Sequence, residues 1–228
     1  MSTAADPTGP PTPRSFPLRR VLGLVALVVV LVAMALSTKF LTPAELASAG
    51  PKKFDPAETA ATLYTQAQDE VPGTAADLAK VVTAVQADPK AAASTYKAVS
   101  PSENAYIFRV KAKATVLEAS AATLRLQVAG VPEATPVLVP LTTAVNGTVL
   151  RDAMGFKFAD APGQTDYQYV GDELKKLILA DISAGIPDPA ALKGRQVDVV
   201  GVVSVVGSGP VPKPKPINVQ PLAVEAAK

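Results

Sequence analysis

The residues of this chain best suited to chemistry lie in one stretch between Arg151 and Tyr167. The planar guanidinium of Arg151 can grip a carboxylate, or a pair of hydroxyl groups, with two parallel hydrogen bonds. Asp152, Asp160 and Asp166 add three carboxylates, and two carboxylates about 5–9.5 Å apart can cleave a glycosidic bond. The stretch therefore predicts a recognition surface or, as the alternative, an enzyme that acts on envelope glycans through acidic residues only.

Other kinds of catalytic and metal chemistry lack their residues. The chain contains no histidine and no cysteine, which excludes the usual catalytic triads, the commonest zinc ligands, disulfides and a lipid-bearing cysteine. There is no glycine-rich dinucleotide motif and no P-loop lysine, and residues 160–166 lack the acid spacing of a calcium loop. We therefore expect no metal, no cofactor and no enzymatic activity.

The charge of the chain is nearly balanced. The first 50 residues hold four of the 22 basic residues and two of the 20 acidic ones, which leaves 18 of each sign in the remainder. Nucleic-acid binding requires a basic footprint to neutralise phosphates. The sequence therefore predicts no nucleic-acid partner.

An uncharged run, residues 21–38, follows Arg19 and Arg20. In a helix, a run of this length rises about 27 Å, close to the ~30 Å hydrocarbon core of a bilayer. Because basic residues are retained on the cytoplasmic side, we predict a single-pass anchor in the cytoplasmic membrane, with the C-terminal domain outside the cytoplasm. A cleaved signal peptide is the alternative, with Ala33 and Ala35 at its exit site.

This run divides the chain into parts. Residues 1–20 are rich in proline and poor in apolar periodicity, which is typical of a disordered tail, and residues 39–54 are expected to form a tether. Residues 55–228 are long enough for one exported domain with its own core. Within it we expect a helical part at 55–100 and a barrel part at 104–228.

Apolar residues spaced three and four apart predict helices in the exported domain. Asp55 can cap a helix that ends near Glu70, because Pro72 follows, and Thr74 can cap the next helix. The helices expected on this basis are 55–70, 75–87, 89–97, 148–154 and 166–185.

Apolar and polar residues alternate from Tyr106 onward, which is typical of half-buried strands. The strands expected on this basis are 106–116, 124–128, 137–141, 196–206 and 217–224. Three strands, a helix and two further strands is the order of the oligonucleotide/oligosaccharide-binding (OB) type of barrel. We therefore predict an α+β fold: an N-terminal transmembrane helix, a helical layer, and a five-stranded OB-like barrel with a helix between strands three and four.

Four basic residues share the polar face of the first two strands: Arg109, Lys111, Lys113 and Arg125. Single-stranded nucleic acid is bound where aromatic side chains alternate with such cations, and no aromatic residue alternates with these four. We expect a solvated outer face.

Three motifs resemble a known family. Residues 148–156, Thr-Val-Leu-Arg-Asp-Ala-Met-Gly-Phe, with the polar and apolar residues that follow as far as Leu174, are similar to the central motif of a bacterial family of predicted periplasmic lipoproteins of unknown function. Residues 104–108 resemble the entry to the first long strand of that family, and residues 194–201 resemble a late strand. The resemblance covers roughly residues 40–226.

The resemblance implies an accessory role in solute uptake, because members of this family are often encoded beside ribose-type sugar ABC transporters. The partner it implies is a sugar ABC transporter subunit or a solute-binding protein. The family often carries a lipidated cysteine after its signal, and this chain has no cysteine, so a protein anchor is expected instead. The sequence thus predicts a membrane-anchored, extracytoplasmic accessory or binding protein.

The expected binding surface combines the central motif with the loop that follows it. A structural alternative stays open, in which Arg151 and Asp152 tie the short helix to the barrel and Gln164 satisfies backbone groups of the loop. The residues predicted to line the surface are Asn104, Arg151, Asp152, Asp160, Gln164 and Tyr167.

Overall fold

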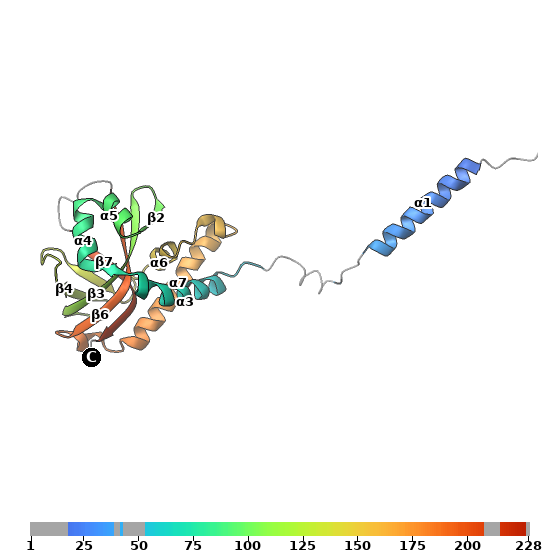
Figure 1. The fold of residues 1–228 in the computed structure, drawn as a ribbon. Coiled ribbons are helices and arrows are strands. Elements are labelled where there is room, and N and C mark those ends of the chain that lie inside the picture. The colour runs from blue at the N-terminus through green and yellow to red at the C-terminus, as the bar shows by residue number, and fades with distance from the viewer. Residues whose placement is uncertain (1–17, 39–41, 43–52, 208–214, 227–228) are drawn as a thin grey trace, which may run out of the picture. The chain divides into compact units, whose positions relative to one another are not determined.

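A computed structural model describes residues 18–38, 42, 53–207 and 215–226 (Figure 1). The chain divides into two compact units, Met1–Lys53 and Phe54–Lys228. Residues 1–17 of the predicted tail, nearly all of the predicted tether at 39–54, and residues 208–214 lie outside the described residues. Residues 18–20, which were predicted to belong to the tail, instead form the beginning of the first helix.

The first unit contains one described helix, α1 (Leu18–Ser37), where the sequence predicts the membrane anchor. The side chains of residues 21–38 are exposed along the whole helix. Among the residues that the structure describes, no helix is both long enough and apolar enough to cross a membrane. The helix is therefore confirmed, and the predicted transmembrane span at 21–38 is not supported.

The second unit is built on a closed ring of five strands. The long strand β3 (Ala105–Ala119) pairs with β4 (Thr123–Val128) on one side and with β6 (Gln196–Val206) on the other. The ring closes through β5 (Val137–Pro140), which runs parallel to β7 (Ile217–Ala226), and through the antiparallel pair β6–β7. This confirms the predicted five strands, their order and the barrel that they form.

Two short strands extend the ring at β3. The two-residue strand β1 (Ala76–Asp77) pairs parallel to the middle of β3, and β2 (Val99–Ser102) pairs antiparallel to its start. The helices of the unit are α3 (Pro56–Thr74), α4 (Leu78–Ala87), α5 (Pro89–Thr95), α6 (Gly147–Ala153) and α7 (Gln164–Gly185), with 3₁₀ turns η1 (Phe158–Asp160) and η2 (Pro189–Leu192).

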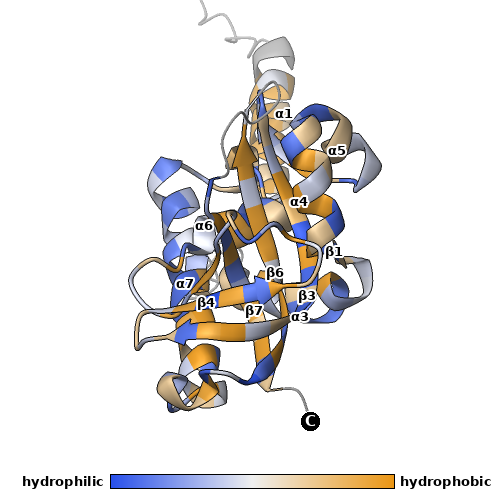
Figure 2. Cartoon of the chain, turned by 90° about the vertical axis from the view of Figure 1, so that its left-hand side faces the viewer, coloured by the Kyte–Doolittle hydropathy of each residue, from blue (hydrophilic) through white to orange (hydrophobic). Residues whose placement is uncertain are grey.

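The inside of the barrel forms one core with α4 and α5. Alternate residues of β3, among them Phe108 and Val116, point inward, as the period of two predicts, and meet Val81 and Val85 of α4. Figure 2 shows the strands as mostly apolar ribbons, with polar residues toward the outside of the helices. The second and third predicted helices therefore pack on the core of the barrel.

A second core lies on the outer face of β3, β6 and β7, under α3, α6 and α7. Ile107 of β3 and Val202 of β6 meet Leu63 of α3 and Leu174 of α7 in it. Because three helices cover this face, Arg109 is only a quarter exposed and does not belong to a solvated basic face. The prediction of a single helical layer is also wrong in one respect, since α3 lies with α6 and α7 and is separate from α4 and α5.

Helix α3 runs four residues beyond the predicted end. Pro72 lies inside its last turn, where the missing backbone N–H removes one hydrogen bond only. The amide of Ala75 still donates to the carbonyl of Val71 at 2.8 Å. Asp77, rather than Thr74, caps the next helix, because its Oδ1 accepts from the Lys80 amide at 3.1 Å.

Candidate functional site

Arg151 is a buried cation at the centre of the predicted site. It lies in α6 with 5% of its surface exposed. Its Nε donates to Oδ1 of Asp152 at 2.9 Å, and its Nη2 lies 2.8 Å from the same oxygen. Its Nη1 donates to the backbone carbonyl of Tyr167 at 2.8 Å, and the guanidinium carbon is 3.5 Å from the centre of the Tyr167 ring. The guanidinium is therefore engaged on both edges and on one face by the protein itself.

Tyr167, at the start of α7, contacts both Arg151 and Asp152. Its hydroxyl donates to Oδ1 of Asp152 at 3.0 Å, so one carboxylate oxygen receives the arginine and the tyrosine together. Burial raises the pKa of Tyr167 above its ordinary value, and the negative charge of Asp152 raises it further. The phenol is thus a hydrogen-bond donor at neutral pH and is a poor general base.

Two further rings stack on Tyr167. Phe156 lies nearly parallel to it, with ring centres 6.0 Å apart, and Phe158 meets it edge-on at 5.7 Å. Phe158 is 57% exposed, whereas the others are half-buried. We call Phe156, Phe158 and Tyr167 the aromatic stack. It presents one apolar ring to solvent on a support that Arg151 and Asp152 fix.

The start of α6 is what places Arg151. Asn146 caps the helix, because its Oδ1 accepts from the Thr148 amide at 3.0 Å and from the Thr148 hydroxyl. The backbone amide of Asn146 donates to Oε1 of Gln220 in β7 at 2.7 Å, which ties the helix to the barrel. A Cβ on Gly147 would lie 2.1 Å from the carbonyl oxygen of Gly171, so only glycine lets α6 approach α7 this closely.

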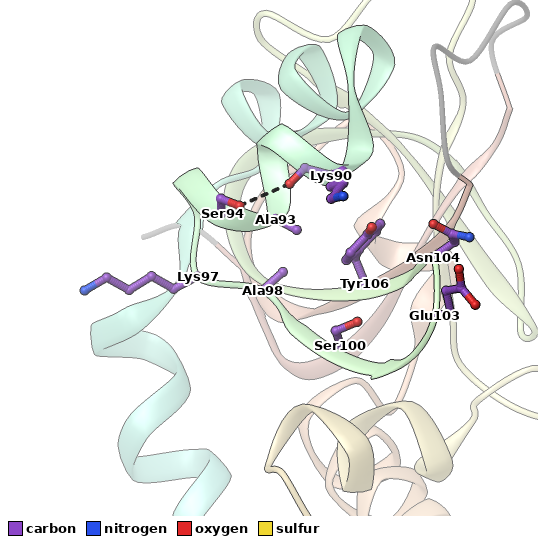
Figure 3. Close-up of a pocket in the computed structure, with 9 residues that line it drawn as sticks. All are labelled: Lys90, Ala93, Ser94, Lys97, Ala98, Ser100, Glu103, Asn104 and Tyr106. Atoms are coloured by element: carbon purple, nitrogen blue, oxygen red, sulfur yellow. Dashed lines mark hydrogen bonds between the residues drawn. The ribbon is translucent and has the colours of Figure 1, made fainter.

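The other predicted site residues are placed separately. Asp160 belongs to the turn η1, where its Oδ2 accepts from the amide of Lys157 at 2.7 Å. Gln164 is exposed at the first position of α7, one turn before Tyr167 and therefore on the same side of the helix. Asn104 lies in the turn between β2 and β3 and lines a pocket with residues of α5 (Figure 3). Arg151, Asp152 and Tyr167 are brought together, with Gln164 beside them, while Asn104 belongs to another place.

Two of the predicted carboxylates are engaged by the protein itself. Asp152 is bound to Arg151 and Tyr167, and Asp160 is bound to a backbone amide. Within the described ranges, no group of three acidic residues is placed to hold a metal ion. The alternative of an acid-based glycan enzyme is therefore not supported by this geometry.

Arg109 is a structural cation that the sequence analysis assigned to a solvated face. Its Nη2 donates to the carbonyl of Ala153 at 3.1 Å, its Nη1 donates to the hydroxyl of Thr74 at 3.2 Å, and the same Nη1 lies 3.6 Å from a carboxylate oxygen of Glu70. It thereby joins β3 to the end of α6 and to α3. No signal in the alternation separates Arg109 from Lys111 and Lys113, because all of them occupy outward positions.

The fold and the site define a class of protein: a mixed α+β domain built on a closed OB barrel. An OB-fold protein from Thermotoga maritima, known from a crystal structure, is similar to this chain with a TM-score of 0.63 and 20% sequence identity; the match covers 77% of this chain and 100% of that one. A search of curated proteins gives no match.

A family model described as "Predicted periplasmic lipoprotein (DUF2291)" matches residues 27–225. The chain therefore belongs to this family of predicted periplasmic lipoproteins, whose function is unknown, as its motifs suggest. Membership favours a place outside the cytoplasm and at a membrane.

Proposed function

We propose that this protein is a non-catalytic accessory protein, held at the outer side of the cytoplasmic membrane, that docks a partner protein on its aromatic stack. One observation carries the proposal: Phe158 is 57% exposed and stands edge-on upon a ring that a buried arginine holds in place. Rigid aromatic side chains of this kind are the commonest anchors of protein–protein interfaces, because little side-chain entropy is lost when they are covered.

Arg151 has a supporting role in this proposal. Its donors are directed to Asp152 and to the backbone of Tyr167, so a ligand carboxylate would have to displace bonds that already exist. Removing a partner from a buried charge costs several kcal/mol. The recognition surface then consists of Phe158, Phe156 and the exposed Gln164 beside them.

The attachment to the membrane is assigned to residues 1–53. The described part of α1 is apolar and exposed on every side, and a helix of that kind is normally covered by protein or lipid. The partner proposed is an extracytoplasmic subunit of a sugar ABC transporter or its solute-binding protein. The gene neighbourhood that the family resemblance implies supports this choice.

In-cell photo-crosslinking tests the docking surface. A photo-reactive phenylalanine analogue at position 158 keeps an aromatic ring there, and the same analogue at Leu117 is the control, because Leu117 is an exposed apolar residue of β3 outside the stack. We expect position 158 to capture a transporter subunit or solute-binding protein, identified by mass spectrometry, and position 117 to capture neither. Equal capture at both positions, or none at position 158, would refute the docking surface.

A further inference from the structure

A polar pocket of about 600 Å³ lies between α5, β2 and the start of β3 (Figure 3). Its walls combine the small side chains Ala93 and Ala98 with hydroxyl, amide and ammonium groups. Its polar side chains include those of Lys90, Ser94, Ser100, Asn104 and Tyr106. No residue of the aromatic stack lines this pocket, so the pocket is distinct from the proposed docking surface.

Tyr106 is the most telling residue of the pocket. It is 8% exposed, and its hydroxyl has no hydrogen-bond partner among the described residues. Every fully buried side-chain nitrogen or oxygen in that part of the chain has a partner, so this hydroxyl must be open to solvent where the residue lines the pocket. A buried tyrosine normally pairs its hydroxyl. The free phenol is a donor and acceptor for a molecule that enters the pocket.

The backbone around the pocket is held in an unusual conformation. The described non-glycine residues with positive φ are Lys97, at 51°, and Asn104, at 57°, and both line this pocket. Such conformations cost of order 1–3 kcal/mol and gather at ligand sites, where the surrounding structure enforces them. The carbonyl of Asn104 accepts from the amide of Gly207 at 2.9 Å, which fixes the turn against the end of β6. Its side-chain amide is bonded to no described residue.

The charge of the pocket comes from Lys90. Within the described residues its ammonium group forms no ion pair, and it lies on the α5 side of the opening. Figure 3 shows the side chain of Lys97 pointing away from the pocket, so Lys97 does not add a second cation there. Glu103 lies beside Asn104 at the other side of the opening. One cation, one carboxylate and several neutral polar groups suit a ligand with a single anionic group and several hydroxyls.

We propose that this pocket binds a small hydroxylated carboxylate, such as an aldonic acid. Lys90 pairs with the carboxylate of the ligand, and Tyr106 and Asn104 bond its hydroxyl groups. The hydroxyls of Ser94 and Ser100 already donate to backbone carbonyls, Ser94 to Lys90 and Ser100 to Ser102 and Ala105. Their oxygens can still accept a hydrogen bond from the ligand.

Calorimetric titration of the full-length protein in detergent with D-gluconate tests the proposal, with glucose as the neutral probe. Two variants remove one group each: Tyr106→Phe removes the hydroxyl and Lys90→Gln removes the charge. Lys113→Gln is the control, because it removes one charge from an exposed side chain of β3 that does not line the pocket. We expect each test variant to weaken gluconate binding about tenfold or more, equivalent to about 1.4 kcal/mol, at an unchanged melting temperature, and the control to bind like the parent.

Three results would overturn the proposal. One is the absence of gluconate binding at millimolar concentration. Another is equal binding of glucose and gluconate together with no effect of Lys90→Gln, which would show that the pocket does not recognise the carboxylate of the ligand. The last is a gluconate affinity that Tyr106→Phe leaves unchanged, which would place the ligand elsewhere. Failure here leaves the docking surface at Phe158 untouched, since crosslinking from position 158 tests that surface separately.

Discussion

Arg151 has the chemistry of a ligand-binding residue, but here its guanidinium group supports the neighbouring side chains of the protein. A guanidinium is suited to carboxylates whether they belong to a ligand or to the protein. Here the carboxylate is that of Asp152, the adjacent residue in the chain, and the flat face lies on Tyr167. These contacts tie α6 to the start of α7, whereas the structural alternative expected the pair to tie the short helix to the barrel.

Substituting Asp152 by alanine tests this role. The change leaves Arg151 buried without its counter-ion, and breaking a pair of this kind costs about 2–4 kcal/mol when one partner stays partly exposed. We expect a free energy of unfolding lower by that amount in urea denaturation. Asp198→Ala is the control, because its pair with Lys113 is exposed and spans 3.8 Å, and should change stability by less than about 1 kcal/mol. Equal effects of the two changes would show that Arg151 is not held by Asp152.

The two tyrosines with raised pKa values predict loss of stability in alkali. Burial raises the pKa of Tyr64 and that of Tyr167 above the ordinary value of 10.0, and nearby carboxylates add to both shifts. Above pH 10 the unfolded chain releases these protons while the folded chain keeps them, so the free energy of unfolding falls as pH rises. Well below pH 10 both groups are protonated in the folded and the unfolded chain, so neither makes the free energy of unfolding depend on pH.

We expect Tyr64→Phe, which removes the more strongly shifted group, to flatten this alkaline decline, as measured by urea midpoints between pH 9 and 11. Its hydroxyl donates to Asp181 at 2.8 Å, so the variant is also somewhat less stable at neutral pH. Tyr169→Phe is the control, since Tyr169 is exposed on the same helix as Asp181. The explanation fails if the alkaline slope of Tyr64→Phe equals that of the parent.

At the residue scale, sequence reasoning placed Arg151, Asp152 and Tyr167 on one surface, and the structure brings the three into contact because α7 packs on α6. It placed Asn104 with them, although the turn just before β3 places this residue at the pocket of Tyr106. Whether the predicted residues bind anything stays a prediction. The free hydroxyl of Tyr106 could not be predicted from the sequence, because an inward position on an alternating strand predicts only that the side chain is buried.

At the scale of elements, the approach of α6 to α7 decides where the site residues lie. Two glycines allow it: a Cβ on Gly147 would meet the backbone of α7, and one on Gly171 would lie 2.7 Å from the methyl group of Thr148. The pair Asn146-Gly147 is typical of a turn and so indicates that the chain bends there. Nothing in the sequence indicates the role of Gly171, because it lies inside a helix, where alanine is preferred to glycine.

Gly171→Ala should therefore destabilise the protein. Overpacking of this kind costs about 1–3 kcal/mol, which outweighs the gain of up to about 1 kcal/mol in helix propensity. Gly185→Ala is the matched control in the same helix, because nothing lies within 4 Å of its added Cβ. We expect thermal melting to show a lower midpoint for Gly171→Ala only. A raised midpoint for both variants would mean that the helices separate easily.

Most elements follow from local patterns, and the exceptions have physical causes. The period of two from Tyr106 is confirmed, and the pairing of β6 with β7 shifts register where Gly201 faces Pro221. Helix α3 continues past its predicted end because a proline in a last turn costs little. The burial of Arg109 depends on helices packing over the outer face of the sheet, which strand alternation cannot reveal.

At the scale of the whole molecule, closure of the sheet explains how a cysteine-free domain holds itself together. The ring β3-β4-β5-β7-β6 leaves no open edge between its members and encloses one core, while three helices build a second core on its outside. The order of strands around a helix was enough to predict this barrel. The placement of the helices could not be predicted in this way. An amphipathic stripe shows that one face of a helix is buried, but it does not show which part of the protein covers that face.

A shortened protein that begins at Phe54 should fold by itself, because all contacts of both cores lie within Phe54–Lys228. We expect a soluble protein with a sharp thermal transition and the melting temperature of the full chain. In cells the full chain should sediment with membranes, whereas the shortened protein, exported through a cleavable signal, should not. Aggregation of the shortened protein, or its continued sedimentation with membranes, would contradict the assignment of attachment to residues 1–53.

Docking of a partner on the exposed ring of Phe158 is best tested by the affinity of Phe158→Ser for the partner captured at position 158. Aromatic anchors contribute about 2 kcal/mol or more, close to thirtyfold in Kd. We expect such a loss with an unchanged melting temperature, while Leu117→Ser binds like the parent. Unchanged affinity for Phe158→Ser, or an equal loss in both variants, would contradict it.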